Sequence, residues 1–412
     1  MNRFFTKLQS VKIRDVLSLL LFLPALLCSR FFRLRHPHLW LICESQGEAR
    51  DNGYWLFKYI REHHPEQEVV YAIDSASADR EKVAILGKVI PYGGFTHWVY
   101  YLAAEKNIST QKDGKPNAAA CYLLEIYGIW KNTRVFLQHG VIINDLKWLY
   151  YPETKMRLFV CGAYPEYQFI RDTFGYPEGY VQYLGLCRFD TLHGHQTDPR
   201  RILVMPSWRE WLTNKIRRSY EFDDIDHFTN TEYFQRWNGF LNDPQLADFL
   251  EEQDLEIYFY PHRNMQPYLS EFRTTCPRIR LADWKRYDIQ ELLKSAAVMV
   301  TDYSSVFMDM VYMRKPVLHY QFDEEKFRRG QYPEGYFSYR NGFGPVCTEQ
   351  AELVAALKDM YGTDGFRMRE PYLSRVKEFF PLYDTENCRR NYEAIRDLPG
   401  RRTQKAEKGV SA

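Results

Sequence analysis

The chain lacks an excess of charge of either sign. Its 412 residues include 55 Lys and Arg against 53 Asp and Glu, which leaves a formal net charge of +2 at pH 7. Nucleic-acid-binding proteins typically carry a clear basic excess, so this balance argues against nucleic acid as a partner. Internal repeats are also missing, and the polar tail Arg401–Ala412 is the one low-complexity stretch. An apolar fraction of 45% is typical of a globular protein, and the length allows two domains.

The sequence lacks the usual patterns of a metal or redox site. Eight cysteines are scattered without a CxxC pair or a Cys-His ligand spacing, and several lie in apolar runs, as Cys43 and Cys161 do. Reduced thiols pack there as small hydrophobic groups, which favours a reducing compartment. His193 and His195 have no further ligand nearby in the sequence, and no acidic pair has a clear ligand spacing. We therefore expect no bound metal and no cofactor.

The sequence also lacks an apolar run long enough to cross a bilayer. The longest one near the N-terminus, Val16–Cys28, has 13 residues and contains Pro24, whereas a span needs about 20 residues. Basic residues stand on both sides of it: Lys7, Lys12, Arg14, Arg30, Arg33 and Arg35. Arginines follow where a signal peptide would need small residues, and basic flanks favour an interfacial helix on an anionic leaflet. We expect residues 1–38 to bind the cytoplasmic face of the membrane peripherally; a first helix packed into the core is the alternative.

The rest of the chain alternates short apolar runs with helical patterns. Leu39–Cys43 reads as a buried strand, and a second series of such units opens at Ile202–Met205. Alternating strands and helices indicate α/β domains with parallel sheets. The boundaries we predict are a first domain at 39–192, a second domain at 200–375, a C-terminal helix at 376–400 and a tail at 401–412. Residues 228–253 read as helical, and Gly330–Gly344 reads as a mobile loop.

The stretch Val298–Tyr320 has the pattern of one βαβ unit. Its apolar strand ends at Thr301-Asp302, and Ser304 and Ser305 follow where a helix would begin. Serine hydroxyls cap helix N-termini, and exposed N–H groups there form a natural site for an anion such as phosphate. A capped helix without any ligand is the alternative at this point.

Two histidines each follow a strand, one in each half of the chain. His139, before Gly140, ends the apolar run Val135–Gln138, and His262 follows Leu255–Tyr260. Ligands of open α/β sheets bind at the carboxyl ends of the strands, and histidine exchanges protons near neutral pH. A single loop histidine more often only makes a hydrogen bond. The pair indicates a site to which both domains contribute.

These motifs together resemble the CDP-glycerol glycerophosphotransferase family, which includes teichoic acid polymerases and primases. The resemblance rests on TDYSSVF from Thr301, KPVLHYQFDEEKF from Lys315, the His-Gly pair at 139–140 and the Gly-x-x-Arg-x-Asp pattern of GLCRFD from Gly185. It covers residues 39–397. It implies a GT-B arrangement, two facing Rossmann-like α/β domains behind an N-terminal membrane-associating helix, with the C-terminal helix bracing the first domain. One departure concerns the residue before His139: family polymerases have Trp there, and this chain has Gln138.

The resemblance implies transfer of glycerol phosphate from CDP-glycerol to a hydroxyl of a lipid-linked envelope glycan, teichoic acid or capsule acceptor, with release of CMP. It makes His139 the general base, and His262 a stabiliser of the transferring phosphate. The residues expected to bind the donor and its phosphates are Arg209, Asp302, Ser304, Ser305 and Asp323. Those expected on the acceptor side are Arg50, Asp51, Asn52 and Gly140.

Other functions remain open at this stage. The donor could be CDP-ribitol or a nucleotide sugar, and the protein could be a non-catalytic, membrane-bound binding protein of the same fold. The sequence does not separate single transfer from polymerisation.

Overall fold

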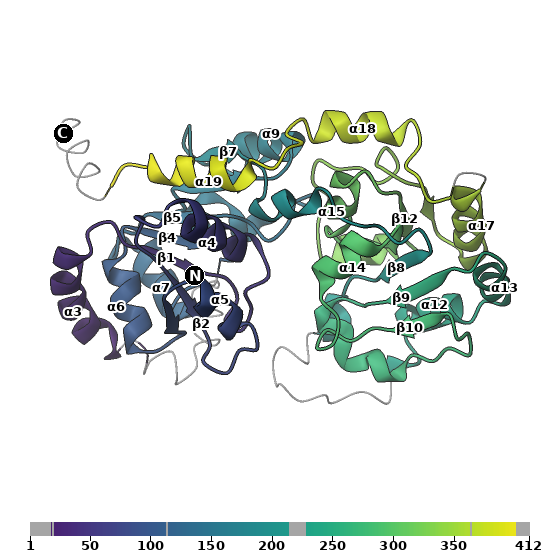
Figure 1. Cartoon of the computed structure of the whole chain (residues 1–412), viewed down its shortest axis with the longest axis horizontal. Helices are drawn as coiled ribbons and strands as arrows, with labels where there is room; N and C mark the ends of the chain where they lie inside the picture. Colours follow the sequence, from purple (N-terminus) through teal and green to yellow (C-terminus); the bar gives the residue numbers. More distant parts are fainter. Residues whose placement is uncertain (1–17, 19, 113, 214–227, 363–364, 401–412) are drawn as a thin grey trace. The chain divides into compact units, whose positions relative to one another are not determined.

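The computed structural model describes residues 18, 20–112, 114–213, 228–362 and 365–400, and it divides the chain into two compact units. Unit 1 holds the residues up to Gly140, Lys147–Asp190 and those from Asp384 onward; unit 2 holds Val141–Leu146 and Thr191–Tyr383. Each unit is an α/β structure with a parallel sheet of its own (Figure 1). The expected α/β class is confirmed.

Unit 1 is built on seven parallel strands in the order β3-β2-β1-β4-β5-β6-β7. The strands are β1 (Trp40–Cys43), β2 (Val69–Ile73), β3 (Val89–Pro91), β4 (Lys106–Ser109), β5 (Arg134–Phe136), β6 (Leu158–Cys161) and β7 (Val181–Tyr183). The central strands are buried along their whole length because helices cover both faces of the sheet, which is typical of parallel sheets. The helical segments are α3 (Phe22–Arg35), α4 (Asn52–His63), α5 (Arg80–Leu86), α6 (Phe95–Ala103), α7 (Ala118–Ile126), η1 (Lys147–Leu149), α8 (Tyr151–Thr154), α9 (Tyr164–Thr173), η2 (Cys187–Leu192) and α19 (Asn387–Arg396).

Unit 2 is built on six parallel strands in the order β10-β9-β8-β11-β12-β13. They are β8 (Arg201–Met205), β9 (Glu256–Phe259), β10 (Ile279–Leu281), β11 (Val298–Thr301), β12 (Val317–Tyr320) and β13 (Val346–Cys347). The helical segments are α12 (Glu232–Leu241), α13 (Pro244–Glu252), η3 (Arg263–Glu271), α14 (Ile289–Ser295), α15 (Phe307–Tyr312), α16 (Glu324–Gly330), α17 (Gln350–Tyr361) and α18 (Tyr372–Phe379). Both sheets have the Rossmann order, in which the strand order reverses at β1/β4 and at β8/β11. Ligand sites of such sheets form beside these positions.

Several local expectations from the sequence differ from the structure. The helical stretch expected at 228–253 consists of two helices, because Asp243 caps a new helix that starts at Pro244. The helix expected at Ser304 begins at Phe307. The segment 330–344, expected to be mobile, places Phe337, Tyr339 and other aromatic rings in the core against Phe307. The aromatic residues of this segment therefore contribute to the packed core.

The described part of the N-terminal segment forms helix α3, which has one packed face and one exposed face. One face packs on α6 of unit 1 through Ala25 and Ser29, and Phe22 contacts Trp98 with ring centroids 6.0 Å apart. The other face is exposed. In the described part of the chain, no helix has the length and apolar character that a membrane span requires. The anchor expected at 1–38 is therefore attached to unit 1 where it is described, and residues 1–17 lie outside the description.

The structure draws the domain limits differently from the sequence. Val141–Leu146, placed in the first domain by the sequence, belongs to unit 2, and the second limit falls after Tyr383. Helix α19 belongs to unit 1, where Asp190 caps its start. The Asp190 carboxylate accepts hydrogen bonds from the backbone N–H groups of Asn387 and Cys388, both at 2.8 Å.

Replacing Asp190 by Ala should destabilise unit 1. The change leaves the first N–H groups of α19 without their acceptor, and loss of a helix cap costs roughly 0.5–2 kcal/mol. Urea unfolding followed by circular dichroism measures this. Asp397→Ala is the matched control: Asp397 follows the other end of α19, is exposed, and pairs with the adjacent Arg396. Equal unfolding midpoints for the two variants would contradict the capping role.

Candidate functional site

The candidate site in unit 1 is centred on His139, which follows β5 at the carboxyl edge of the sheet. Its side chain is 73% exposed, and its Nδ1 lies 2.5 Å from Oδ2 of Asp51. A carboxylate only accepts hydrogen bonds, so Nδ1–H of the ring is the donor. The neutral ring therefore keeps its lone pair on Nε2. His139 has the arrangement of a general base oriented by a carboxylate.

Asp51 connects three parts of unit 1. It caps α4 by accepting from the N–H of Asn52 at 2.8 Å, it binds the His139 ring, and its Oδ1 accepts from Nη1 of Arg188 at 3.0 Å. The same Nη1 donates to the backbone oxygen of His139 at 2.8 Å. Arg188 thus holds both the carboxylate and the backbone of the histidine.

The charges in this group shift the pKa values of both dyad members. Burial acts to raise the pKa of Asp51, but His139, Arg188 and the hydrogen bonds together hold it below its ordinary value. The negative charge of Asp51 raises the pKa of the largely exposed His139 ring above its ordinary value, against the opposing effect of the Arg188 charge. The imidazolium therefore persists to higher pH than in a free histidine, and proton acceptance by His139 increases as pH rises through this raised pKa.

The backbone before His139 is held in an unusual conformation. Gln138 has φ 64°, the left-handed region that non-glycine residues rarely adopt. The Asn52 amide donates to the backbone oxygens of Leu137 and Gln138, at 3.3 and 2.8 Å, and its Oδ1 accepts from the N–H of Arg188 at 3.0 Å. The buried Gln138 side chain donates to the oxygen of Val160. Strain of this kind persists only where the surroundings enforce it, so Asn52 and Gln138 are positioning residues for His139.

Glu44 belongs to this site although the sequence reading did not single it out. It follows β1, is 2% exposed, and accepts hydrogen bonds from the N–H groups of Arg50, Asp51 and Tyr54 at the start of α4. Burial, together with the charge of Asp51, raises the pKa of Glu44 to about 7. A Cβ on Gly53 would lie 2.9 Å from Cγ of Glu44. The sequence feature that could have identified Glu44 is an acidic residue directly after a buried strand.

The other acceptor-side candidates have separate places in the structure. The Arg50 guanidinium donates to the carboxylate of Asp79, with Nε and Oδ2 2.8 Å apart, whereas the neighbouring side chain of Asp51 contacts His139. Gly140 directly follows His139 and ends the first stretch of unit 1. Asp51 and Asn52 are therefore the acceptor-side candidates that contact the His139 segment through their side chains.

In unit 2, three of the expected donor-side residues form one buried ionic network. Arg209 is fully buried; its Nε and Nη2 donate to the two oxygens of Asp323, at 2.7 and 3.0 Å, and its Nη1 lies 2.9 Å from Oδ2 of Asp302. The network joins the segments that follow β8, β11 and β12. Burial acts to lower the pKa of Arg209, but the two carboxylates raise it. Carboxylates occupy its donors, so Arg209 acts through Asp302 and Asp323 in this arrangement.

Ser304 and Ser305 are half-buried in the turn between Asp302 and α15. The Ser304 hydroxyl accepts from the N–H of Val306 at 3.4 Å, and no side chain caps α15. The prediction that these serines are the N-cap of the helix is therefore wrong, because a turn separates them from it. Their side chains remain partly accessible beside Asp302.

His262 lies three residues after β9 and begins η3. Its Nδ1 accepts a hydrogen bond from the N–H of Asn264 at 3.1 Å. An accepting Nδ1 places the proton of the neutral ring on Nε2, so His262 can donate from Nε2 without being charged. This arrangement complements that of His139, whose Nε2 accepts. The expectation that both histidines act on one phosphoryl group stays a prediction.

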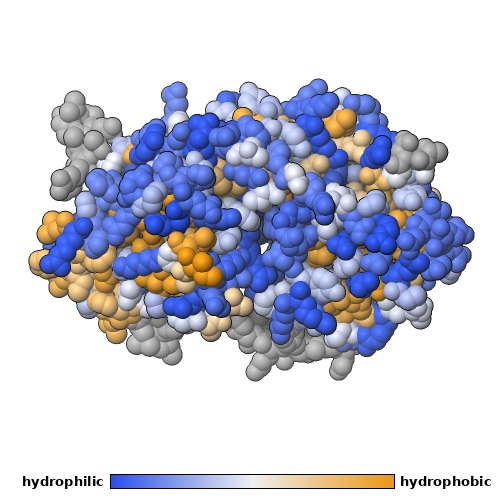
Figure 2. All heavy atoms as spheres, viewed as in Figure 1, coloured by the Kyte–Doolittle hydropathy of each residue, from blue (hydrophilic) through white to orange (hydrophobic). Residues whose placement is uncertain are grey.

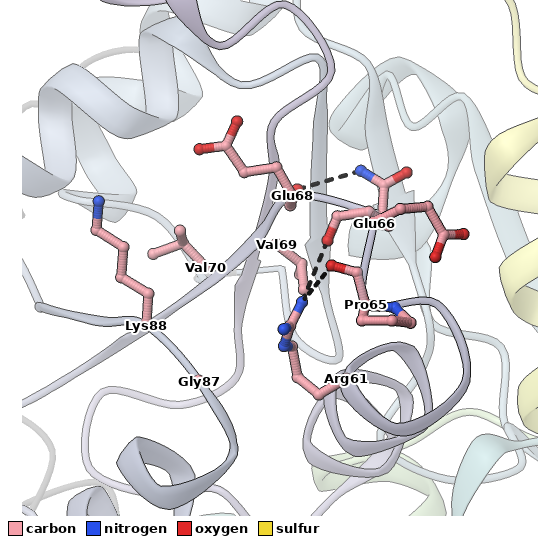
Figure 3. Close-up of a pocket in the computed structure, with 9 residues that line it drawn as sticks. Arg61, Pro65, Glu66, Glu68, Val69, Val70, Gly87 and Lys88 are labelled. Carbon is pink, nitrogen blue, oxygen red and sulfur yellow. Dashed lines mark hydrogen bonds between the residues drawn. The ribbon is translucent and has the colours of Figure 1, made fainter.

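Other features of the described residues lie apart from these groups. No cluster of three or more His, Cys, Asp and Glu side chains among them is placed to hold a metal. His193 contacts the hydroxyl of Tyr312, and His195 donates to the oxygen of Leu192. A cavity of about 290 Å³ in unit 1 lies beside the starts of β2 and β3, at the opposite edge of the sheet from His139 (Figure 3). Arg61 in its wall is bonded to the carbonyl oxygens of Pro65 and Gln67.

Comparison with known proteins gives similarity in both sequence and fold. A family model described as CDP-Glycerol:Poly(glycerophosphate) glycerophosphotransferase matches residues 186–397. The chain is 30% identical over 377 residues to the minor teichoic acid biosynthesis protein GgaB of Bacillus subtilis (strain 168); this covers 89% of the chain and 40% of that relative's length. The wall teichoic acid polymerase TagF has a similar structure (TM-score 0.63, 14% identity, 94% of this chain and 100% of that one). The UDP complex of S. aureus MnaA is more distant (TM-score 0.53, 12% identity, 87% and 95%).

The replacement Asp51→Asn should lower the pKa of His139. It removes the negative charge that raises this pKa, so the value should move toward the ordinary one of about 6.5. NMR titration of the His139 ring, with ¹³C-labelled histidine and His139→Ala for assignment, measures the change. Asp79→Asn is the control because Asp79 binds Arg50 instead. Identical His139 titrations in the wild type and both variants would contradict the dyad.

Proposed function

The chain belongs to the CDP-glycerol:poly(glycerophosphate) glycerophosphotransferase family, and from this membership we propose that it transfers glycerol phosphate from CDP-glycerol to a hydroxyl of an envelope glycan or teichoic acid chain. The observation that supports this most directly is the exposed His139 ring bonded to Asp51. Such a dyad can take the proton of an acceptor hydroxyl. A CDP-ribitol or nucleotide-sugar donor is the second candidate, since the dyad itself does not distinguish between donors.

In the proposed reaction, the acceptor oxygen attacks the β-phosphorus of CDP-glycerol while its proton moves to Nε2 of His139. A bond forms between the acceptor oxygen and phosphorus, and the bond between that phosphorus and the oxygen of CMP breaks. Asp51 stabilises the imidazolium that results. Arg188 and Asn52 keep the histidine backbone in place.

On the donor side, we propose that the turn of Ser304 and Ser305 contacts the pyrophosphate of the donor. Support comes from the partly accessible hydroxyls and from the buried network that fixes the turn through Asp302. Arg209 and Asp323 then act as positioning residues. His262 donates from Nε2 to the transferring phosphate; because it can do so while neutral, we expect no loss of activity at high pH from this residue.

Purified protein with CDP-glycerol and glycan or poly(glycerol phosphate) acceptors should release CMP only when an acceptor is present. His139→Ala should lower turnover by roughly 10²–10⁴-fold, the usual contribution of a positioned base, while donor affinity and melting temperature stay near wild type. His38→Ala, a highly exposed histidine beside Glu105, is the control. A folded His139→Ala protein with wild-type turnover would exclude the base role. CMP or nucleoside diphosphate release only from other donors would select the second candidate.

We also propose that α3 holds the protein peripherally on an anionic membrane surface, at the cytoplasmic face, where a lipid-linked acceptor is accessible. The large apolar side chains on its outer face, together with Leu20 just before the helix, are 60–75% exposed: Leu20, Leu23, Leu27, Phe31 and Leu34. Their spacing of three and four residues places them in one stripe along the helix, and Figure 2 shows apolar surface over α3. Arg30, Arg33 and Arg35 supply positive charge, and the helix has no acidic residue. Such a helix binds at the interface of a bilayer.

The double replacement Leu27→Glu with Phe31→Glu should strongly weaken binding to vesicles that contain anionic lipids. Each apolar side chain moved out of water contributes roughly 1.5–3 kcal/mol, so partitioning should fall at least roughly 100-fold. Substitution is preferable to deletion, because removing α3 would uncover α6. Ile85→Glu with Tyr164→Glu changes exposed side chains elsewhere in unit 1 and is the control. Vesicle co-sedimentation gives the result; unchanged binding of the α3 variant rejects the anchor.

A further inference from the structure

A strip of unit 1 outside the dyad carries cations over tyrosine rings. In the segment Lys147–Arg157, the Nζ of Lys147 lies 4.7 Å from the ring centroid of Tyr150, and the Nζ of Lys155 lies 4.7 Å from that of Tyr151. Arg157 stacks at 4.1 Å over Tyr180. We call Lys112, Tyr122, Lys147–Arg157 and Tyr180 the lysine–tyrosine strip.

Contacts connect the separate segments of the strip. Lys112 donates to the backbone oxygen of Trp148 at 3.0 Å and lies 5.0 Å from the ring centroid of Tyr122. The hydroxyl of Tyr122 donates to Glu153 at 2.7 Å. Further along, the rings of Tyr151 and Tyr180 are 6.0 Å apart. Side-chain contacts therefore link the elements that form the strip.

One end of the strip lies at the same edge of the sheet as His139. Lys112 follows β4, at the carboxyl edge of the sheet that also carries His139. Arg157 directly precedes β6, and its N–H donates to the oxygen of Arg134 at the start of β5. The strip thus leads from the edge with His139 to the opposite edge of unit 1. A chain whose end reaches His139 can continue along it.

The charge of the strip is strongly one-sided. Its cations are Lys112, Lys147, Lys155 and Arg157, and its one carboxylate, Glu153, already accepts from Tyr122. Lys155 has φ 51° at the end of α8, a position where glycine would avoid the strain. A lysine kept in a strained position is consistent with a function of its side chain.

We propose that the lysine–tyrosine strip binds the anionic chain of the acceptor, a phosphodiester-linked polyol or glycan. This rests on the proposed function, which places the acceptor hydroxyl at His139. Lysine and arginine bind phosphate oxygens, and aromatic side chains such as Trp148, 45% exposed, offer flat apolar surfaces to polyol carbons. A lipid surface fits less well, because the strip has no exposed large aliphatic side chain; those lie mainly on α3.

The double charge reversal Lys147→Glu with Lys155→Glu tests the strip. Calorimetric titration with poly(glycerol phosphate) oligomers of increasing length should show affinity falling at least roughly tenfold, with a larger loss for longer oligomers. In transfer assays, the KM for these oligomers should rise while kcat and the KM for CDP-glycerol stay unchanged. Lys358→Glu with Lys377→Glu makes the same charge change on α17 and α18 and should match the wild type. Lys147→Arg with Lys155→Arg should retain binding.

The outcomes separate the strip from the proposed function. The titration measures binding and needs no transfer. Oligomer binding that is lost on charge reversal therefore supports the strip even if the protein does not consume CDP-glycerol. Failure to consume CDP-glycerol would reject the proposed function and leave the strip standing. Oligomer affinity unchanged by the reversal overturns the strip. Loss of binding to anionic vesicles with unchanged oligomer affinity also overturns it, because the surface then binds lipid headgroups.

Discussion

The bond between the Asp51 carboxylate and Nδ1 of His139 is the interaction on which the candidate site depends. The carboxylate starts α4, orients the ring and receives Arg188, so it couples the helix that follows β1 to the loop that follows β5. Asn52, the next residue, secures the backbone of that loop. Chemistry at Nε2 therefore relies on a helix N-terminus that other parts of unit 1 also stabilise. Glu44, beneath the same N-terminus, fixes the three N–H groups that precede and open the helix.

The pattern of GLCRFD illustrates how one short motif serves several of these contacts. Gly185 has φ 78°, and a Cβ there would lie 1.8 Å from Oδ1 of Asn387. Both the left-handed backbone conformation at position 185 and the close approach of α19 require glycine there. Arg188 reaches the dyad, and Asp190 caps α19. The motif thus joins the C-terminal helix and the candidate site within six residues, and a spacing of this kind is readable in a sequence.

Strand positions and the α/β class were predictable because a buried parallel strand needs an apolar run, as at Val298–Thr301. The strand-end position of His139 followed from the same patterns. Its partnership with Asp51 did not, because the contact spans 88 positions in the chain and depends on how the strands are ordered. The burial of Arg209 did not follow from the sequence for a related reason: the sequence shows an arginine after a strand, but not the two carboxylates that enclose it. Burial is a property of the packed unit.

The uncovered face of α3 has a consequence for the protein away from any bilayer. Leu27 and Phe31 are held outward on a helix whose other side is committed to the core, so the stripe cannot fold inward to escape water. We therefore expect newly synthesised or purified chains to reduce this exposure by pairing their stripes with each other. Self-association of this kind would depend on protein concentration and on detergent, and it would not require a specific quaternary structure.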